Sequence, residues 1–328
     1  MLRRTAEEEG RMRVCLMIEG QEDVTWEQWL ALAGACEEHG LEALFRSDHY
    51  GPLMGMPERG SLDAWATLAG LAARTSRIRL GTLVSPATFR HPSVLAKMVV
   101  TADHISGGRV ELGLGAGWHE GEHRAFGFDF PPTPVRMERL AEQLEIVSRT
   151  FTDDAFSFQG RHYQLQDLPA LPKPVQRPRP TVLVGGAAGP KSLALAARWA
   201  DEYNTTGVPL EELPGRRRRL LDAWREAGRD PGTARLSLMT TCVAGRDRGE
   251  VEERVGRVLA VTGSDASVAE VIDDRPNWLL GTVDELAERF ASLEAAGVSR
   301  VMLQHLNHTD LDMVAVLGEV AATMGSAP

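Results

Sequence analysis

A short apolar strand pattern followed by an amphipathic helix pattern recurs along almost the whole chain, and this repeat restricts the possible folds more than any other feature. The expected strands cover 14–18, 43–45, 78–84, 110–114, 181–184, 202–204, 236–243 and 301–303. The expected helices cover 25–40, 62–72, 94–104, 137–147, 191–199, 215–227, 248–261, 282–296 and 311–324. Apolar strands that alternate with helices are typical of a parallel sheet covered by helices.

Eight strand–helix units are the number that closes such a sheet into a (β/α)8 barrel. We therefore expect residues 13–328 to form one α/β domain of this type, and a doubly wound open sheet is the alternative. Residues 1–12 are rich in charge and lack an apolar stretch, so we expect a disordered extension there.

Helix-end signals support the assignment of two of the helices. Thr25 and Gln28 have capping-box spacing, as do Thr282 and Glu285, so a helix is expected to start at each pair. Gly40 is placed to end the first of these helices in the left-handed conformation.

Three segments do not fit the repeat: 120–134 after the fourth strand, 152–180 before the fifth, and 262–277 before the eighth. The second contains a hairpin pattern followed by a proline-rich connector. Barrel enzymes build their active sites from loops that follow strands. We therefore expect the first and third insertions to wall a substrate pocket.

The composition excludes several classes of function. A net charge of −10 and a pI near 5.5 argue against a nucleic-acid or anionic-membrane surface. No apolar run approaches the ~20 residues that span a bilayer, and no signal sequence is evident, so we expect a cytoplasmic protein. The arginines at 216–219 are interpreted as a solvated helix face. The three cysteines, Cys15, Cys36 and Cys242, lack metal-site spacing and are interpreted as free thiols, and no metal site is expected.

Four segments at or near strand ends could carry chemistry. Asp48 and His49 follow the second strand, where a carboxylate could orient an imidazole for proton transfer. The segment 81–92 must bend sharply after Val84. The glycines of 112–117 could let the backbone pass close to a planar ring. The small residues of 184–190 precede a helix, an arrangement that suits a phosphate group.

Together, in this order, these segments resemble the bacterial luciferase-like flavin monooxygenase and coenzyme F420-dependent oxidoreductase family. The most specific part is SRIRLGTLVSPATFRHP at 76–92 and AKMVVTADHISGGRVELGLGAGW at 96–118. Within the family, the Asp-His pair after strand two makes the F420-dependent branch the most similar.

The resemblance implies a role for each matching residue. Asp48 and His49 would line the cofactor ring, with His49 handling a proton or facing the substrate, and both are expected to be catalytic. The Leu83–Val84 peptide would be cis and would back the ring. Other matching positions are expected to bind the cofactor: Thr82, Gly115 and Gly117, the phosphate loop Gly185, Gly186 and Ala187, and Asn204 and Thr205.

One position departs from the family pattern. Where the sugar-phosphate dehydrogenase branch carries a catalytic glutamate, this chain has Trp118, which cannot act as an acid. That particular activity is therefore not expected. Glu120 and Glu122 are the nearest carboxylates in the sequence.

The resemblance implies hydride transfer between coenzyme F420 and a small organic substrate, in a homodimer. The alternatives are an FMN-dependent monooxygenase that uses reduced flavin and oxygen, and a ligand-binding barrel without turnover.

Overall fold

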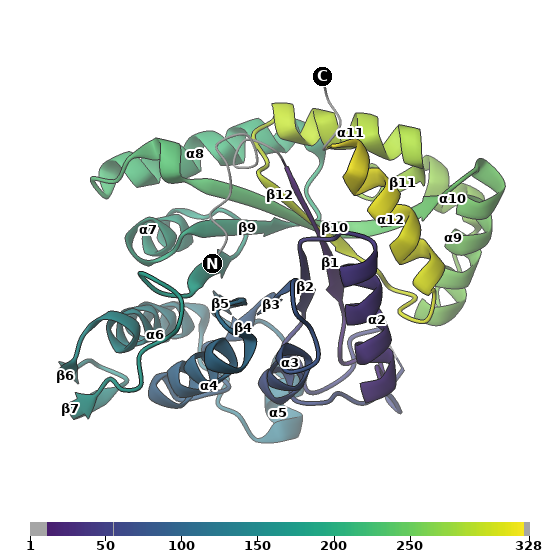
Figure 1. Ribbon diagram of the computed structural model, residues 1–328. Coiled ribbons are helices and arrows are strands. Elements are labelled where there is room, and N and C mark those ends of the chain that lie inside the picture. Colours follow the sequence, from purple (N-terminus) through teal and green to yellow (C-terminus); the bar gives the residue numbers. More distant parts are fainter. Residues whose placement is uncertain (1–11, 55, 325–328) are drawn as a thin grey trace.

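The computed structural model describes residues 12–54 and 56–324 (Figure 1). Its central element is a closed ring of parallel strands in the order β1–β2–β3–β5–β8–β9–β10–β12, with β12 paired to β1 and β9 paired to β10. The predicted (β/α)8 barrel is thereby confirmed, and the β9–β10 pairing excludes the open sheet. The ring strands are β1 Arg13–Ile18, β2 Ala43–Arg46, β3 Arg79–Thr82, β5 Val110–Gly115, β8 Thr181–Gly185, β9 Glu202–Thr206, β10 Arg235–Gly245 and β12 Arg300–Gln304.

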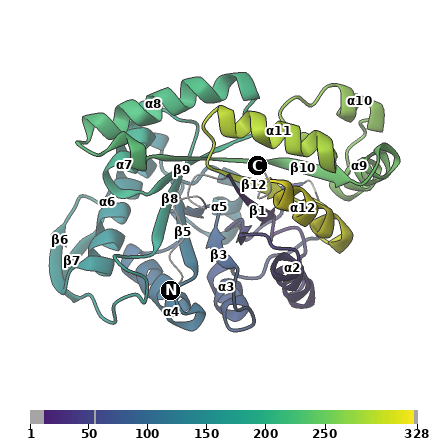
Figure 2. The ribbon, with the colours of Figure 1, turned by 45° about the horizontal axis from the view of Figure 1, so that its top comes forward.

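Helices surround the ring of strands (Figure 2). They are α2 Trp26–Glu38, α3 Ala64–Ala72, α4 Pro92–Ser106, α6 Thr133–Thr152, α7 Pro190–Trp199, α8 Leu213–Glu226, α9 Arg248–Thr262, α11 Val283–Ala295 and α12 Leu311–Thr323. Both predicted capping boxes are present, at the starts of α2 and α11, and Gly40 has the expected left-handed φ of 78°. No helix in the described ranges is long and apolar enough to cross a bilayer.

The insertions contain more regular structure than their sequences indicate. The hairpin is confirmed as β6 Ala155–Gln159 paired antiparallel with β7 Gln164–Pro169. The first insertion begins with helix α5 Glu120–Phe126, and the third contains α10 Val268–Asp273. Strand β11 Leu279–Thr282 pairs in parallel with the C-terminal part of β10 and lies outside the ring. Two 3-10 turns, η1 Leu210–Glu212 and η2 Pro231–Thr233, flank α8.

The third strand is shorter than predicted. It was expected over 78–84, but β3 ends at Thr82 and a two-residue strand, β4 Ser85–Pro86, pairs with β5 after it. The Leu83–Val84 peptide between them is cis, as expected. The backbone N–H of Leu83 donates to Arg46 O at 2.8 Å, which ties this turn to the end of β2.

Buried charged side chains form ion pairs inside the barrel, near the N-terminal ends of the strands. Arg300, fully buried, contacts Glu111 and Glu202 at 2.8 Å each, and Arg13 reaches Glu202 at 3.1 Å. Burial raises the pKa of Glu111, but the guanidinium groups of Arg300 and Arg79 outweigh it and hold that pKa well below its usual range. The Glu111 carboxylate therefore stays ionised at neutral pH inside the barrel.

Apolar side chains fill the middle of the barrel. They are Cys15, Met17, Ala43, Phe45, Leu83, Leu183 and Met302, with the partly exposed Val84 and Met239 packed against them. All three cysteines are buried free thiols, as predicted. Barrel enzymes place their active sites at the C-terminal ends of the strands, above such a packed interior.

The expected N-terminal extension falls almost wholly on residues 1–11, which lie outside the described residues. Met12 is described and buried, and its N–H donates to Glu294 Oε1 at 2.8 Å. The ordered chain therefore begins no later than Met12.

Candidate active site

The Asp48–His49 segment leaves β2 at the C-terminal end of the barrel, as predicted, but the two side chains do not pair. Both oxygens of buried Asp48 bind Arg90, at 2.6 and 3.1 Å, and Oδ2 also accepts from Ser85 Oγ at 2.6 Å. The expectation that Asp48 orients the imidazole is thus wrong. Its carboxylate is saturated by Arg90 and Ser85, and it holds the end of β2 against the turn after β3.

His49 is instead held by a glutamate from the first insertion. Its Nδ1 lies 2.7 Å from Glu122 Oε2, and the Glu122 side chain has no exposed area. The other oxygen, Oε1, accepts the backbone N–H groups of Tyr50 and, at 3.2 Å, Gly51. Glu122 was noted in the sequence as a nearby carboxylate, and helix α5 carries it to the end of β2.

The His49–Glu122 pair has a defined electrostatic character. Burial lowers the pKa of His49, but the hydrogen bond to Glu122 and the charges of Glu122, Glu19 and Asp48 outweigh it, so this pKa is raised. Burial raises the pKa of Glu122, but the contacts with His49 and the two backbone N–H groups outweigh burial, so the pKa is lowered overall. The pair therefore favours an imidazolium beside a carboxylate over a wider pH range than free histidine would.

Aromatic side chains stand on the outer side of His49. Trp118, 64% exposed, meets the imidazole edge-on with ring centroids 5.8 Å apart. His119 lies 6.4 Å from His49, centroid to centroid, and its Nδ1 is 3.9 Å from Glu122 Oε2. Trp118 and His119 thus lie next to His49 on the side away from the barrel interior.

The predicted glycines near strand ends make room for the protein's own side chains. A Cβ on Gly115 would lie 2.7 Å from Val84 Cγ2, and one on Gly185 would lie 3.1 Å from Val84 Cγ1. Gly117 has φ +81°, and a Cβ there would lie 2.8 Å from Thr88 Oγ1. The Cβ positions of Gly115 and Gly117 therefore point at Val84 and Thr88 of the same chain.

The predicted phosphate loop lies at the start of α7, and part of its backbone is already bonded. Gly186 N–H donates to Asn204 O at 3.1 Å, and Ala188 N–H donates to Tyr203 Oη at 2.8 Å. Helix α7 begins at Pro190, its N-cap residue Gly189 has no side chain to cap it, and Lys191 is in its first turn. Gly186 thus serves the fold, while the uncapped helix start can still donate to an anion.

An unexpected cation lies beside this loop. Arg216, interpreted from the sequence as part of a solvated face, is 16% exposed and donates to Thr205 Oγ1 and to Glu212. Its Nε is covered and has no partner among residues 12–54 and 56–324. The interpretation holds for the exposed Arg218 and Arg219 but is wrong for Arg216, and the half-buried Arg217 donates to Gly297 O at 2.8 Å.

Three other predicted residues belong to the barrel wall. Thr82 Oγ1 donates to Gly113 O at 3.1 Å, and Asn204 Nδ2 donates to Ser237 Oγ at 2.9 Å. Thr205 is fully buried, and its Oγ1 accepts a hydrogen bond from Arg216. These hydroxyl and amide groups are hydrogen-bonded to other groups of the protein in the barrel wall.

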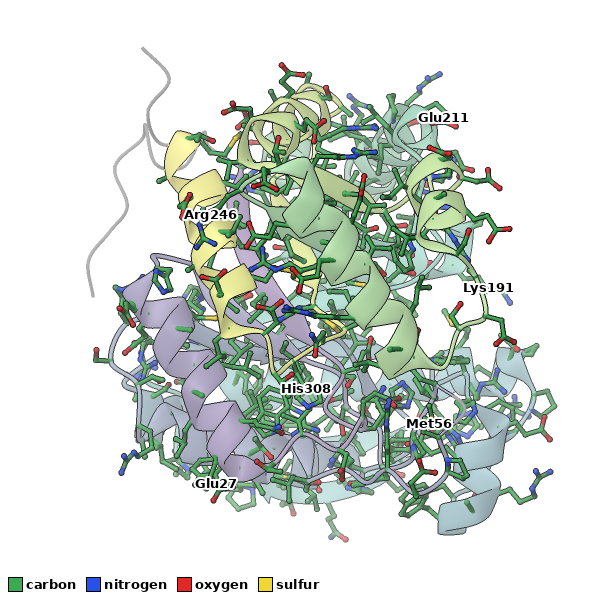
Figure 3. The ribbon with its side chains drawn as sticks, turned by 90° about the vertical axis from the view of Figure 1, so that its right-hand side faces the viewer. Glu27, Met56, Lys191, Glu211, Arg246 and His308 are labelled. Carbon is green, nitrogen blue, oxygen red and sulfur yellow. The ribbon has the colours of Figure 1, made fainter. Side chains whose placement is uncertain are left out.

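The loop after β2 and the end of α9 contact each other near the C-terminal end of the barrel. Arg59 donates to Val261 O at 2.6 Å at the end of α9, and a Cβ on Gly263 would lie 3.0 Å from Met56 Cε. Figure 3 shows Met56 beside this end of α9. Asn277 Nδ2 donates to Gly207 O at 3.3 Å, so the third insertion folds back over the C-terminal end as predicted.

Comparison with known proteins gives one family and two kinds of relative. The sequence profile described as luciferase-like monooxygenase matches residues 12–300. An F420-dependent glucose-6-phosphate dehydrogenase of Microbacterium testaceum is 34% identical over 54% of this chain and 52% of its own length. An FMNH(2)-dependent dimethylsulfone monooxygenase of Pseudomonas putida is 26% identical over 71% of this chain and 70% of its own. The chain therefore spans about half the length of the first curated relatives it matches.

A solved structure agrees with the fold. An F420-dependent secondary alcohol dehydrogenase in complex with an F420–acetone adduct superposes with a TM-score of 0.81 at 19% identity, covering 94% of this chain and 98% of the other. At this identity, the likeness supports the barrel architecture alone.

Proposed function

The chain belongs to the luciferase-like monooxygenase family, and on that premise we propose that it is an oxidoreductase that transfers hydride between coenzyme F420 and a small organic substrate. The observation that carries the proposal is His49, held by buried Glu122 at the C-terminal end of β2. Its Nε2 has no partner among the described residues and is available for a proton. F420-dependent relatives favour this cofactor.

The residues present suit a phosphorylated deazaflavin. The uncapped start of α7, Lys191 and the unpartnered Nε of Arg216 provide donors and positive charge for a phosphate. Val84 and Met239, partly exposed above the packed interior, offer an apolar surface for a planar ring. When bound, the deazaflavin would supply the hydride chemistry, and the barrel supplies orientation and electrostatics.

The chain's own groups would manage the accompanying proton. Because Glu122 accepts the Nδ1 proton of His49, the imidazole gives or takes the substrate's proton at Nε2. Trp118 and His119 shield this imidazole on its outer side. Asp48, saturated by Arg90, would act as a positioning residue, a narrower role than the catalytic one expected from the sequence.

A second candidate is an FMN-dependent monooxygenase, supported by the dimethylsulfone monooxygenase match. FMN has a comparable three-ring core and a phosphate, so the same apolar surface and cationic loop would suit it. A barrel that binds a ligand without turnover is the third possibility. A cytoplasmic homodimer is part of the proposal.

The deciding experiment titrates purified protein with F420 and with FMN while cofactor fluorescence is followed. We expect F420 to bind with micromolar or lower Kd, about −8 kcal/mol or stronger, and more tightly than FMN. Micromolar FMN binding without detectable F420 binding would move the function to flavin-dependent oxygenation. Binding of F420 without any redox change, with every donor tried, would favour the non-catalytic barrel.

A further inference from the structure

The carboxylate of Glu122 faces two imidazoles at the mouth of the barrel. It accepts from His49 Nδ1 at 2.7 Å and lies 3.9 Å from His119 Nδ1. We propose that Glu122 is a positioning residue that fixes the tautomer and the charge of His49. This inference deepens the proposed function, and its first test needs no cofactor.

The tautomer follows from the chemistry of the two groups. An ionised carboxylate can only accept hydrogen bonds, so His49 Nδ1 must carry a proton in this contact. The group that changes its proton during a reaction is then Nε2. Without Glu122, either nitrogen could carry the proton, and a fraction of the molecules would present the wrong one.

The carboxylate is itself rigidly placed, which makes it an effective orienter. Oε1 accepts from Tyr50 and Gly51 N–H, so Oε2 is the oxygen left for His49. Glu122 lies in the first turn of α5, where the helix dipole also favours a negative charge. Helix α5 therefore sets the His49 ring through a buried contact between segments 73 residues apart.

The charge of His49 depends on every ionisable group that faces it. Glu122 approaches from α5 and Glu19 from the end of β1, Asp48 is the preceding residue in the loop after β2, and all three favour the imidazolium. Asp48 is neutralised by Arg90, and Glu19 makes no hydrogen bond to His49 among the described residues. Glu122 is thus the main source of the stabilisation. His119, one-third exposed, is the second imidazole near the same carboxylate.

The first test follows the imidazole of His49 by NMR pH titration of the full chain without cofactor. In E122Q, which keeps the shape but not the charge, the pKa of His49 should fall by about 1–3 pH units. The matched control is E120Q, in the same first turn of α5 but exposed, which should leave this pKa unchanged. An unchanged titration of His49 in E122Q would overturn the proposal.

Glu122 also accepts two backbone N–H groups, so E122Q could fail to fold. E122D keeps the charge but withdraws it by one methylene, and the pKa of His49 should then lie between those of the wild type and a histidine without a carboxylate partner. A pKa in E122D equal to the wild-type value would overturn the proposal.

The second test measures the pH profile of kcat with bound cofactor. In E122Q, the limb assigned to His49 should move in the same direction as its NMR titration, and the maximal rate should fall about 10²-fold. If the NMR titration moves but the pH profile does not, Glu122 still sets the imidazole, and the proton role given to His49 under the proposed function is wrong.

Discussion

Gly115→Ala tests whether the glycine at the end of β5 makes room for Val84. A Cβ at this position would lie 2.7 Å from Val84 Cγ2, closer than real Cβ contacts come. Val84 has no easy escape, because its other methyl group faces Gly113 and Gly185 and valine has few χ1 rotamers. Overpacking of this kind costs about 1–3 kcal/mol in the free energy of unfolding.

The double mutant isolates the contact. In a V84A background the clashing methyl group is gone, so Gly115→Ala should cost less than about 0.5 kcal/mol there. Gly113→Ala is the matched control, since its Cβ would lie 2.1 Å from the backbone oxygen of Thr82. Removing the Val84 methyl groups relieves the 2.9 Å contact of this Cβ with Val84 Cγ1 but not the backbone clash, so Gly113→Ala should remain strongly damaging in both backgrounds.

Urea unfolding followed by circular dichroism measures each of these variants and the wild type. Gly34→Ala is a reference for the substitution itself, because Gly34 is exposed on α2 with nothing within 4 Å of the added atom. It should stabilise by about 0.5–1 kcal/mol. If Gly115→Ala costs the same with and without Val84, the space at Gly115 is not reserved for that side chain.

Two further predictions concern the ligand. His49→Ala should slow turnover about 10²-fold while the cofactor Kd stays within about twofold, a change of only ~0.4 kcal/mol; an unaltered rate would reduce His49 to a packing residue. Arg216→Gln should raise the Kd of the phosphorylated cofactor about tenfold, or ~1.4 kcal/mol, whereas Arg218→Gln, on the exposed side of α8, should leave it unchanged. Equal Kd values for both arginine variants in fluorescence titration would show that the phosphate binds elsewhere.

The barrel was predictable because its signal is repeated and local. Each strand is a mostly apolar segment, and each helix has its own periodicity and, in places, its own cap. A wrong boundary in one strand–helix unit therefore does not change the assignment of the next. The bounds of the third strand were wrong because apolar residues recur up to Val84, whereas β3 ends at Thr82 and pairing with β5 resumes only at Ser85. Helix α5 and strand β11 were missed because short elements inside insertions carry too few residues to show a period.

The site was predictable only in part, because its contacts join distant segments. His49 was found from its place after a strand, but nothing local links it to Glu122. Arg216 could have been placed better. It lies three residues after Leu213 and four before Leu220, both fully buried, so helical spacing puts it on the inner face of α8. Four consecutive arginines favoured a solvated face for the whole run, so the inner position of Arg216 was not recognised.

The glycines show why a motif can locate a site without identifying its ligand. Glycine in a strand signals that something approaches the backbone closely, and the pattern at 112–117 suggested a ring. In the structure the side chain of Val84 stands where a Cβ on Gly113, Gly115 or Gly185 would lie, in front of both β5 and β8. On the opposite side, Ser85 bonds Asp48 next to His49. The turn after β3 therefore sets the spacing between the apolar surface at Val84 and the imidazole of His49.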